Sequence, residues 1–296
     1  MGNSITFFLD GKEVTADKDE SIWQVAKKQG NTLPHLCYSD KTGYRADGNC
    51  RACMVSIDGE RVLAASCIRK PAEGMKVSTL DERSKKSREM VLELLVTDQP
   101  KKNDSHDPNS HFWNMANKVN VEESRFDKKP KSQVPVSDIS NKAMSVNLDS
   151  CIHCNLCVRA CREVQVNDVI GMGMRGHSSK VIFDFDDPMG ESTCVSCGEC
   201  VQACPTGALM ESTLLDEYGK HKGEPDREVD SLCPYCGVGC QLTFKIKDEK
   251  IVSAVGRDGP ANNNRLCVKG RFGFDYIHNP ERITKPLIRK KGIKKD

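Results

Sequence analysis

The sequence predicts an α+β protein that consists of several small modules rather than one large core. The chain has 296 residues, a hydrophobic fraction of 38% and an aromatic fraction of only 5%. Its sixteen cysteines fall into groups of four, eight and four, separated by stretches without cysteine. Small modules bury a lower fraction of their surface than large ones, so they often need a covalent or metal staple. The cysteines are the candidates for that role.

The cysteine groups and the polar stretches between them predict the domain boundaries. Two stretches separate the groups, and the first also contains apolar residues at helical spacing. The expected segments are residues 1–80, 81–142, 143–212 and 229–296.

The first segment is expected to open with a β-hairpin and a helix. Asp10 and Gly11 separate the short apolar runs Ile5–Leu9 and Val14–Thr15, which is typical of a hairpin turn. Ser21, followed three residues later by Gln24, predicts a capping box at the start of a helix.

A second hairpin is expected between cysteines of the first segment. Met54–Ile57 and Arg61–Ala64 flank another turn pair, Asp58 and Gly59. The succession of strands, helix and hairpin predicts a small α+β domain.

The second segment is expected to be one amphipathic helix and a linker. Apolar residues recur at helical spacing between Asp81 and Val96, namely Met90, Val91, Leu94 and Leu95. Residues 99–140 have few apolar positions and many Lys, Asn, Asp, Ser and Pro, so we expect a linker or a poorly packed segment there.

The third segment contains an internal repeat, in which the spacing Cys-x2-Cys-x2-Cys-x3-Cys occurs twice. The repeat predicts a module with pseudo-twofold symmetry. In two-cluster bacterial ferredoxins the fourth cysteine of each motif binds the other cluster. By this resemblance one [4Fe-4S] cluster would be held by Cys151, Cys154, Cys157 and Cys204, and the second by Cys194, Cys197, Cys200 and Cys161.

Zinc is the alternative metal for paired cysteines, because a zinc ribbon offers two Cys-x2-Cys pairs. Zinc sites rarely use three cysteines so close together, which favours iron–sulfur clusters. His153 lies between two of the cysteines, but neither motif lacks a cysteine, so we expect it to be a loop residue that tunes the sulfur environment.

The fourth segment is expected to contain β-structure. Leu242, Phe244 and Ile246 alternate with polar residues, and a strand is expected at Ile251–Val255 after the turn residues Asp248–Lys250.

Composition excludes several classes of protein. The balance of 44 basic and 42 acidic residues gives a formal charge of +2, and no basic patch with interleaved aromatics supports nucleic-acid binding. No run of apolar residues is long enough to span a membrane. The N-terminus has no export signal, so we expect a reduced, cytoplasmic protein rather than a disulfide framework.

The surroundings of the first cysteine group resemble a known [2Fe-2S] domain. Cys37, Cys50, Cys53 and Cys67 depart from the plant-type ferredoxin spacing. The similar families are the complex I large iron–sulfur subunit, the [FeFe] hydrogenases and the α subunits of NAD-linked formate dehydrogenases. The resemblance implies a β-grasp, ferredoxin-like domain with one [2Fe-2S] cluster. It rests on Leu33-Pro34-His35-Leu36-Cys37-Tyr38 and Asp47-Gly48-Asn49-Cys50-Arg51-Ala52-Cys53-Met54-Val55.

The last cysteine group favours one of these families. It resembles the N-terminal [4Fe-4S] segment of molybdenum or tungsten bis-pterin oxidoreductases, formate dehydrogenases in particular. The resemblance implies a third [4Fe-4S] cluster, the start of a molybdopterin-oxidoreductase Fe4S4 domain, and a place for Lys269 between cluster and pterin. It rests on Cys233-Pro234-Tyr235-Cys236-Gly237-Val238-Gly239-Cys240 and Cys267-Val268-Lys269-Gly270-Arg271.

The chain departs from these families at one point. Relatives often carry a further site, His-x3-Cys-x2-Cys-x5-Cys, after the amphipathic helix. Here Gln99, Asn103, His106 and Phe112 take the four positions, so we expect no cluster there.

The resemblance implies a role in formate oxidation as part of a larger chain or complex. Electrons would pass from a metal–pterin centre through the clusters towards a flavin partner that reduces NAD. The family's catalytic cysteine or selenocysteine lies beyond the segment that this chain covers, so we expect the segment alone to be inactive on formate. A free-standing electron carrier or adaptor and a relative of the complex I subunit are the alternative interpretations.

Overall fold

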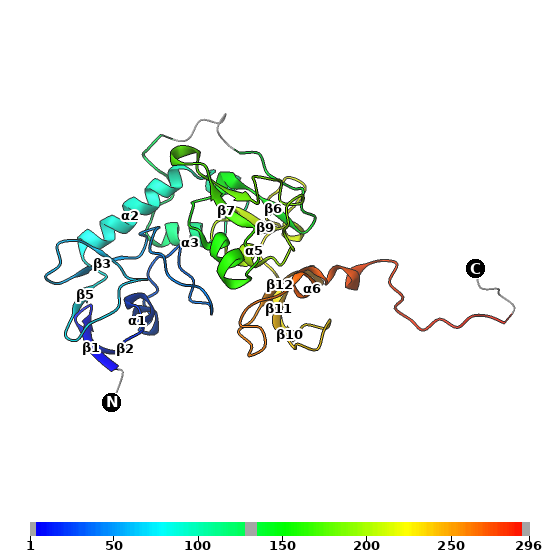
Figure 1. Ribbon diagram of the computed structural model, residues 1–296, viewed down its shortest axis with the longest axis horizontal. Coiled ribbons are helices and arrows are strands. Elements are labelled where there is room, and N and C mark those ends of the chain that lie inside the picture. The colour runs from blue at the N-terminus through cyan, green and yellow to red at the C-terminus, as the bar shows by residue number, and fades with distance from the viewer. Residues whose placement is uncertain (1–3, 128–134, 292–296) are drawn as a thin grey trace.

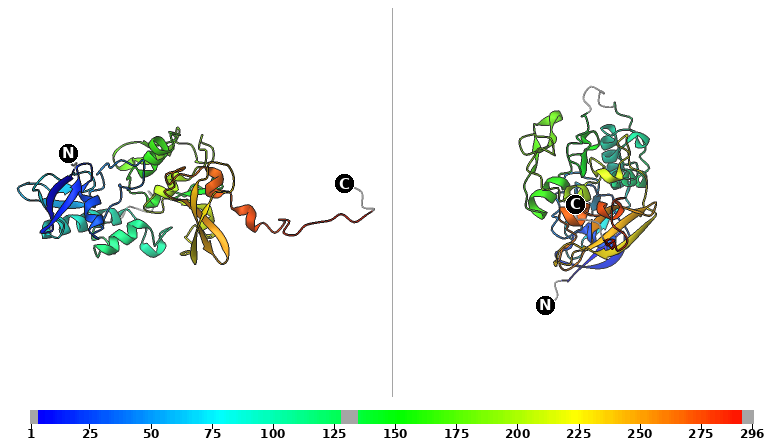
Figure 2. Two further views of the ribbon diagram at one scale, coloured as in Figure 1. Left: turned by 90° about the horizontal axis from the view of Figure 1, so that it is seen from below. Right: turned by 90° about the vertical axis from the view of Figure 1, so that its right-hand side faces the viewer.

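The structure is a computed structural model that describes residues 4–127 and 135–291. Its modules follow one another along the long axis of the molecule in chain order, from the blue end to the orange end (Figure 1). The strands of the last module lie at the far end, and residues 280–291 extend away from them (Figure 2). No helix in the described part of the chain is both long and apolar enough to cross a membrane.

The first module is a five-stranded mixed sheet with one helix against it. The strand order is β2-β1-β5-β3-β4, and the short β5 joins the two hairpins because it pairs in parallel with β1 and antiparallel with β3. The expected first hairpin and the capping box of Ser21 and Gln24 are both present. The elements are β1 (Ser4–Leu9), β2 (Lys12–Asp17), α1 (Ile22–Lys28), β3 (Met54–Ile57), β4 (Ala64–Ala65) and β5 (Lys76–Ser78).

The second hairpin is shorter than expected. We expected a strand at Arg61–Ala64, but the strand that pairs with β3 contains only Ala64 and Ala65. Arg61 and Val62 are exposed, so they have no apolar surface to cover and the chain bends there instead.

The expected amphipathic helix is α2 (Glu82–Thr97), capped by the side chain of Asp81. Its most buried face differs from the one expected, because Leu94 is 50% exposed. Arg88 lies on the buried face and donates to the carbonyls of Met54 and Thr79, at 2.8 and 2.6 Å. These bonds fix the helix to the sheet. The buried line is Ser84, Arg88, Leu92 and Val96.

The expectation of a linker or poorly packed segment at residues 99–140 is wrong for its first part. The helix α3 (His111–Lys118) forms there, and Phe112 and Trp113 are 0% and 1% exposed. These rings pack with Leu36 and Ala52 of the first module. Burial of these two rings against the first module stabilises the helix, and the polar composition of the segment gave no sign of it.

The ferredoxin-like module joins its two cysteine motifs through a short sheet. β6 (Met144–Val146) pairs antiparallel with β9 (Leu209–Glu211), so the two ends of the module lie side by side. Each motif leads into a short helix, α4 (Leu156–Arg159) or α5 (Glu199–Ala203). A hairpin that the sequence had not suggested, β7 (Ile170–Gly173) and β8 (Lys180–Phe183), lies between the motifs.

The third module is a three-stranded antiparallel sheet followed by a short helix. β11 (Gln241–Lys247) and β12 (Lys250–Gly256) match the expected strands. β10 (Arg227–Leu232) was not expected, since its residues are mostly exposed and show no apolar alternation. The helix α6 (Val268–Phe272) begins directly after Cys267.

Short helical turns complete the described structure. They are η1 (Lys102–Asp104), η3 (Leu148–Ser150), η4 (Ala160–Val164), η5 (Gly176–Ser178), η6 (Ser212–Leu214) and η7 (Asp275–His278).

Candidate iron–sulfur sites

The structure gathers the sixteen cysteines into four groups, and none of them forms a disulfide. We call these groups site 1 (Cys37, Cys50, Cys53, Cys67), site 2 (Cys151, Cys154, Cys157, Cys204), site 3 (Cys161, Cys194, Cys197, Cys200) and site 4 (Cys233, Cys236, Cys240, Cys267).

Site 1 lies in the loops beside the sheet of the first module. Cys37 and Cys53 are fully buried, and the backbone N–H of Cys50 donates to the Sγ of Cys37 at 3.4 Å. Hydrogen bonds from the thiols of Cys50 and Cys67, the Cys50 bond first, lower the pKa of Cys37 to about 2. The hydrogen bonds with Cys37 raise the pKa of Cys50 and Cys67, so in the metal-free site Cys37 carries the negative charge and these two thiols stay protonated. Because the thiolate is the form that binds iron, metal binding must displace those protons.

The close packing of site 1 depends on an unusual backbone. Gly48 has φ +60°, and a Cβ at this position would collide with the side chain of Ile68. Arg51, between Cys50 and Cys53, also has a positive φ, of 58°. These left-handed residues curl the loop so that its backbone N–H groups point towards the sulfurs.

Sites 2 and 3 are built from loops with the same backbone conformation. His153 and Asn155 have φ values of 54° and 62°, and Ser196 and Gly198, at the matching positions of the second motif, have 51° and 71°. In both loops the second residue after the first cysteine donates its N–H to that cysteine's Sγ at 3.4 Å. The internal repeat in sequence is thus a repeat in structure.

The fourth cysteine of each ferredoxin motif lies with the other motif. Cys204 lines one cavity with Cys151, Cys154 and Cys157. A second cavity contains Cys161 together with Cys194, Cys197 and Cys200. Each cavity therefore contains three cysteines of one motif and the fourth cysteine of the other, as the resemblance to two-cluster ferredoxins predicts. The role of these cysteines as cluster ligands stays a prediction.

The cavities of sites 2 and 3 are apolar, and this affects their thiols. Burial is the largest cause that raises the pKa of Cys151 to about 11. Burial also raises the pKa of Cys157 and Cys200 well above the ordinary value. In the metal-free chain these thiols are neutral, so metal binding must displace their protons.

Site 4 is the most open of the groups. Cys236 and Cys267 are exposed, whereas Cys233 and Cys240 are partly buried. The backbone N–H of Cys233 donates a hydrogen bond of 2.9 Å to the carbonyl of Cys240. Lys269 lies on α6 and is exposed, two residues after Cys267.

Three of the four residues at the positions of the relatives' further site have other partners. Gln99 donates to the carbonyl of Ser150 at 3.1 Å, and Phe112 is part of the apolar core. His106 contacts the Gly219 carbonyl at 2.8 Å and the Asp149 carboxylate at 3.3 Å.

The spacing of the donors bears on the choice between zinc and clusters. Across residues 4–127 and 135–291, no three His, Cys, Asp or Glu side chains form a group that could hold a metal ion. A tetrahedral zinc site needs four ligands about one ion, with Zn–S near 2.3 Å. Cluster ligands bind different iron atoms and stand further apart. All-cysteine donors, apolar cavities and N–H bonds to sulfur together fit iron–sulfur clusters.

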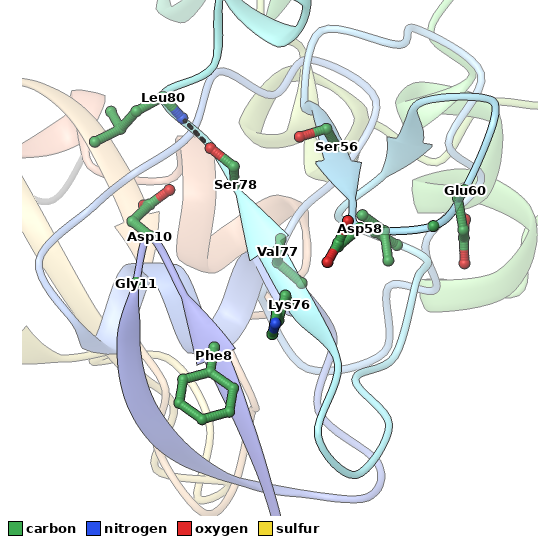
Figure 3. Close-up of a pocket in the computed structure, with 12 residues that line it drawn as sticks. Phe8, Asp10, Gly11, Ser56, Asp58, Glu60, Lys76, Val77, Ser78 and Leu80 are labelled. Carbon is green, nitrogen blue, oxygen red and sulfur yellow. Dashed lines mark hydrogen bonds between the residues drawn. The ribbon is translucent and has the colours of Figure 1, made fainter.

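A surface hollow in the first module lies away from the cysteines. Figure 3 shows it between β1, β3 and β5, with Asp10, Asp58 and Glu60 among the residues around it. No cysteine lines this hollow, so it is not part of the candidate sites.

Family models match the chain in three places that correspond to the cysteine groups. Residues 2–82 match a 2Fe-2S iron–sulfur cluster binding domain, residues 150–208 a 4Fe-4S dicluster domain, and residues 226–279 a molybdopterin oxidoreductase Fe4S4 domain. A protein named "Putative formate dehydrogenase" in Staphylococcus haemolyticus is 29% identical to this chain, and the match covers 99% of this chain.

This chain resembles the N-terminal iron–sulfur portion of a formate dehydrogenase α subunit.

Other comparisons agree with this resemblance. A probable oxidoreductase of Bacillus subtilis is 29% identical over 98% of this formate dehydrogenase-like chain. The chain spans about a third (33%) of the length of these curated relatives. A chain of the crystal structure of NAD⁺-reducing [NiFe]-hydrogenase in the H2-reduced state shares its fold, with a TM-score of 0.61 and 24% identity, covering 70% of this chain and 87% of that one.

Two buried arginines of this formate dehydrogenase-like chain belong to the candidate sites, although the sequence did not predict a role for them. Arg159 and Arg271 are 2% and 0% exposed, and each donates to the backbone carbonyl of a candidate ligand, Cys37 and Cys197 respectively. Arg159 is 122 positions from Cys37, and Arg271 is 74 positions from Cys197. Local patterns carry no signal for contacts at such separations.

Proposed function

We propose that this chain is the electron-transfer portion of a formate dehydrogenase α subunit. It relays electrons from a molybdenum- or tungsten-pterin centre towards a flavin-containing partner that reduces NAD. The observation that carries the proposal is the presence of four all-cysteine sites distributed over consecutive modules. The clusters would supply one-electron storage at potentials set by cluster type, hydrogen bonds to sulfur and burial.

The sixteen cysteines would hold one [2Fe-2S] cluster in site 1 and one [4Fe-4S] cluster in each of sites 2, 3 and 4. The domain limits proposed for these modules are 1–80, 143–212 and 229–296, with 81–142 as the connection. Parts of 1–80, 81–142 and 229–296 lie outside the described residues. The donor N–H groups at Cys37, Cys151 and Cys194 would stabilise the sulfurs' negative charge.

Contacts between the sites support an order for the relay. Cys37 of site 1 and Cys154 of site 2 belong to one apolar cluster. At the other end, Gly270 lies against the Sγ of Cys233 in site 4, and its neighbour Arg271 bonds the carbonyl of Cys197 in site 3. The proposed order is therefore site 4, site 3, site 2 and site 1.

The residues at the two ends of this order would face the other components. Lys269 would lie between site 4 and the pterin, because it follows the last cysteine of site 4 and is exposed. Site 1 would face the flavin partner. We place the protein in the cytoplasm, since sixteen cysteines without a disulfide suit a reducing compartment. The isolated segment would not oxidise formate.

Iron and sulfide analysis of the anaerobically purified chain, with EPR after reduction by dithionite, tests the proposal. One [2Fe-2S] and three [4Fe-4S] clusters would give about fourteen iron atoms per chain. Zinc in place of iron, or the absence of a [2Fe-2S] signal, would contradict it. A free-standing electron carrier remains the second candidate, since the chain itself provides all the cysteines of its four sites. Formate-dependent reduction of the clusters in the complete natural protein distinguishes the two.

A further inference from the structure

Arg159 lies where the first module meets the ferredoxin-like module. One of its terminal nitrogens, Nη2, donates to the carbonyl of Cys37 at 2.6 Å and to that of Cys154 at 3.4 Å. The other terminal nitrogen donates to the carbonyl of Arg45, and Nε is 3.1 Å from the carboxylate of Asp47. One guanidinium therefore binds the ligand-bearing backbones of sites 1 and 2 at the same time.

Arg271 occupies the corresponding position where the ferredoxin-like module meets the third module. Its Nε donates to the carbonyl of Cys197 at 2.8 Å, and Nη1 donates to the side chain of Gln202 at 2.9 Å. Its Nη2 is 3.3 Å from the carboxylate of Glu199, which is 1% exposed. The arginine comes from α6 and directly follows Gly270, which lies against the Sγ of Cys233 in site 4.

The two junctions thus share one arrangement. Each has a buried arginine from one module, a carboxylate from its neighbour, and a bond to the backbone carbonyl of a candidate ligand in that neighbour. By contrast, the pair of Arg227 with Glu249 is exposed and lies within one module, and the pair of Arg45 with Glu163 joins the first two modules through an arginine that is 63% exposed.

Stability alone does not account for such pairs. Removing two charges from water costs several kcal/mol per ion, and well-packed apolar residues often do as well or better. The planar guanidinium fork, however, holds several acceptors at fixed directions, which a lysine ammonium cannot do. Because electron tunnelling falls steeply with distance, a device that fixes the separation of two clusters has a functional consequence.

We propose that Arg159 and Arg271 are positioning residues of the relay: Arg159 holds sites 1 and 2, and Arg271 holds sites 3 and 4, at the separation that electron transfer needs. The inference rests on the proposed function, because it requires clusters in these sites. Neither arginine would bind a cluster directly; each acts through the backbone carbonyl of a ligand.

Arg159→Lys and Arg271→Lys in the full chain test the inference, because lysine keeps the charge and loses the fork. The readout is the magnetic coupling between neighbouring reduced clusters in EPR, together with the rate of electron exchange between them. In Arg159→Lys we expect weaker coupling and slower exchange for the pair of sites 1 and 2 only. In Arg271→Lys we expect the same for sites 3 and 4 only. Each variant is the control for the other, and Arg227→Gln is the control for an exposed arginine.

Arg159→Gln and Arg271→Gln add a second readout, the reduction potential. Arg271→Gln leaves the buried carboxylate of Glu199 without its cation, and Arg159→Gln removes one of the two arginines beside Asp47. Each variant loses a positive charge near its clusters, so the reduced, more negative cluster is less favoured. We expect the equilibrium constant for one-electron reduction of the adjacent clusters to fall at least tenfold, which corresponds to a reduction potential lower by about 59 mV. The lysine variants should keep their potentials nearer to those of the unaltered chain.

The outcomes separate this inference from the proposed function. If the unaltered chain lacks iron or the cluster signals, the proposed function fails. If the unaltered chain carries its clusters and the lysine variants keep full iron content with unchanged coupling and exchange, only the positioning role is overturned. Loss of iron from both lysine variants would also overturn it, since the arginines would then serve assembly rather than spacing.

Discussion

The hydroxyl of Tyr44 donates a hydrogen bond of 2.9 Å to the carboxylate of Glu199, although 155 positions separate the two residues. The second oxygen of Glu199 is 3.3 Å from Arg271. All three modules therefore meet at one buried carboxylate, Tyr44 from the first, Glu199 from the second and Arg271 from the third.

Tyr44→Phe tests the contribution of this contact to stability. The substitution removes a donor from a buried carboxylate, which costs about 1–3 kcal/mol. We expect a lower midpoint of thermal unfolding for the loaded protein. Tyr218→Phe is the control, because Tyr218 is 78% exposed. Equal midpoints for the two variants would show that Tyr44 contributes nothing to the junction.

Trp113→Ala tests whether α3 joins the first module to the rest. Trp113 is 1% exposed and packs with Phe112, their ring centroids 5.3 Å apart. Truncating a buried tryptophan costs about 3–5 kcal/mol. We expect a large drop in the free energy of unfolding in denaturant and faster proteolysis near α3. Phe185→Ala is the control, since Phe185 is 97% exposed. A decrease in the free energy of unfolding as small as that of the control would support the interpretation of this segment as a linker.

Glu211 predicts a dependence of stability on pH. It is 3% exposed, and its burial raises the pKa of its carboxyl from 4.5 to about 7. Between these values the folded protein holds the proton more tightly than the unfolded chain, so stability falls as pH rises and the penalty is complete above pH 7. The pKa difference corresponds to about 3 kcal/mol.

Glu211→Gln should remove this penalty. We expect a higher unfolding midpoint than that of the unaltered protein at pH about 8 and little difference at pH about 5, as measured by thermal unfolding at both values. Glu217→Gln, at an exposed position, is the control. A gain of equal size at both pH values would mean that the carboxyl does not titrate in this window.

The exchange of cysteines between motifs predicts a non-additive loss of iron. Cys151 and Cys204 lie in different sequence motifs but line the same cavity. We expect Cys151→Ala, Cys204→Ala and the double variant each to lose one cluster, about four iron atoms. Cys151→Ala combined with Cys194→Ala is the comparison, and it should lose about eight. A loss of about eight from the Cys151 and Cys204 pair would assign each cluster to a single motif.

Local patterns in the sequence determined the cysteine loops, the first hairpin and the start of the first helix. The cysteine spacings imply loops that curl around a centre, and His153 and Ser196 have the left-handed conformation that such loops need. The capping box of Ser21 and Gln24 and the first hairpin depend on residues a few positions apart, so neighbouring residues suffice to specify them.

Only the tertiary structure decided the contacts between the modules. β10 is mostly exposed and shows no apolar alternation, so nothing in its own residues indicated a strand. Phe112 belongs to a polar stretch and is buried because Leu36 and Ala52 approach it from the first module. Arg159 and Arg271 find their acceptors in other modules. Burial and hydrogen bonding at these positions depend on atoms that the chain brings together only when it folds, and a local pattern cannot contain them.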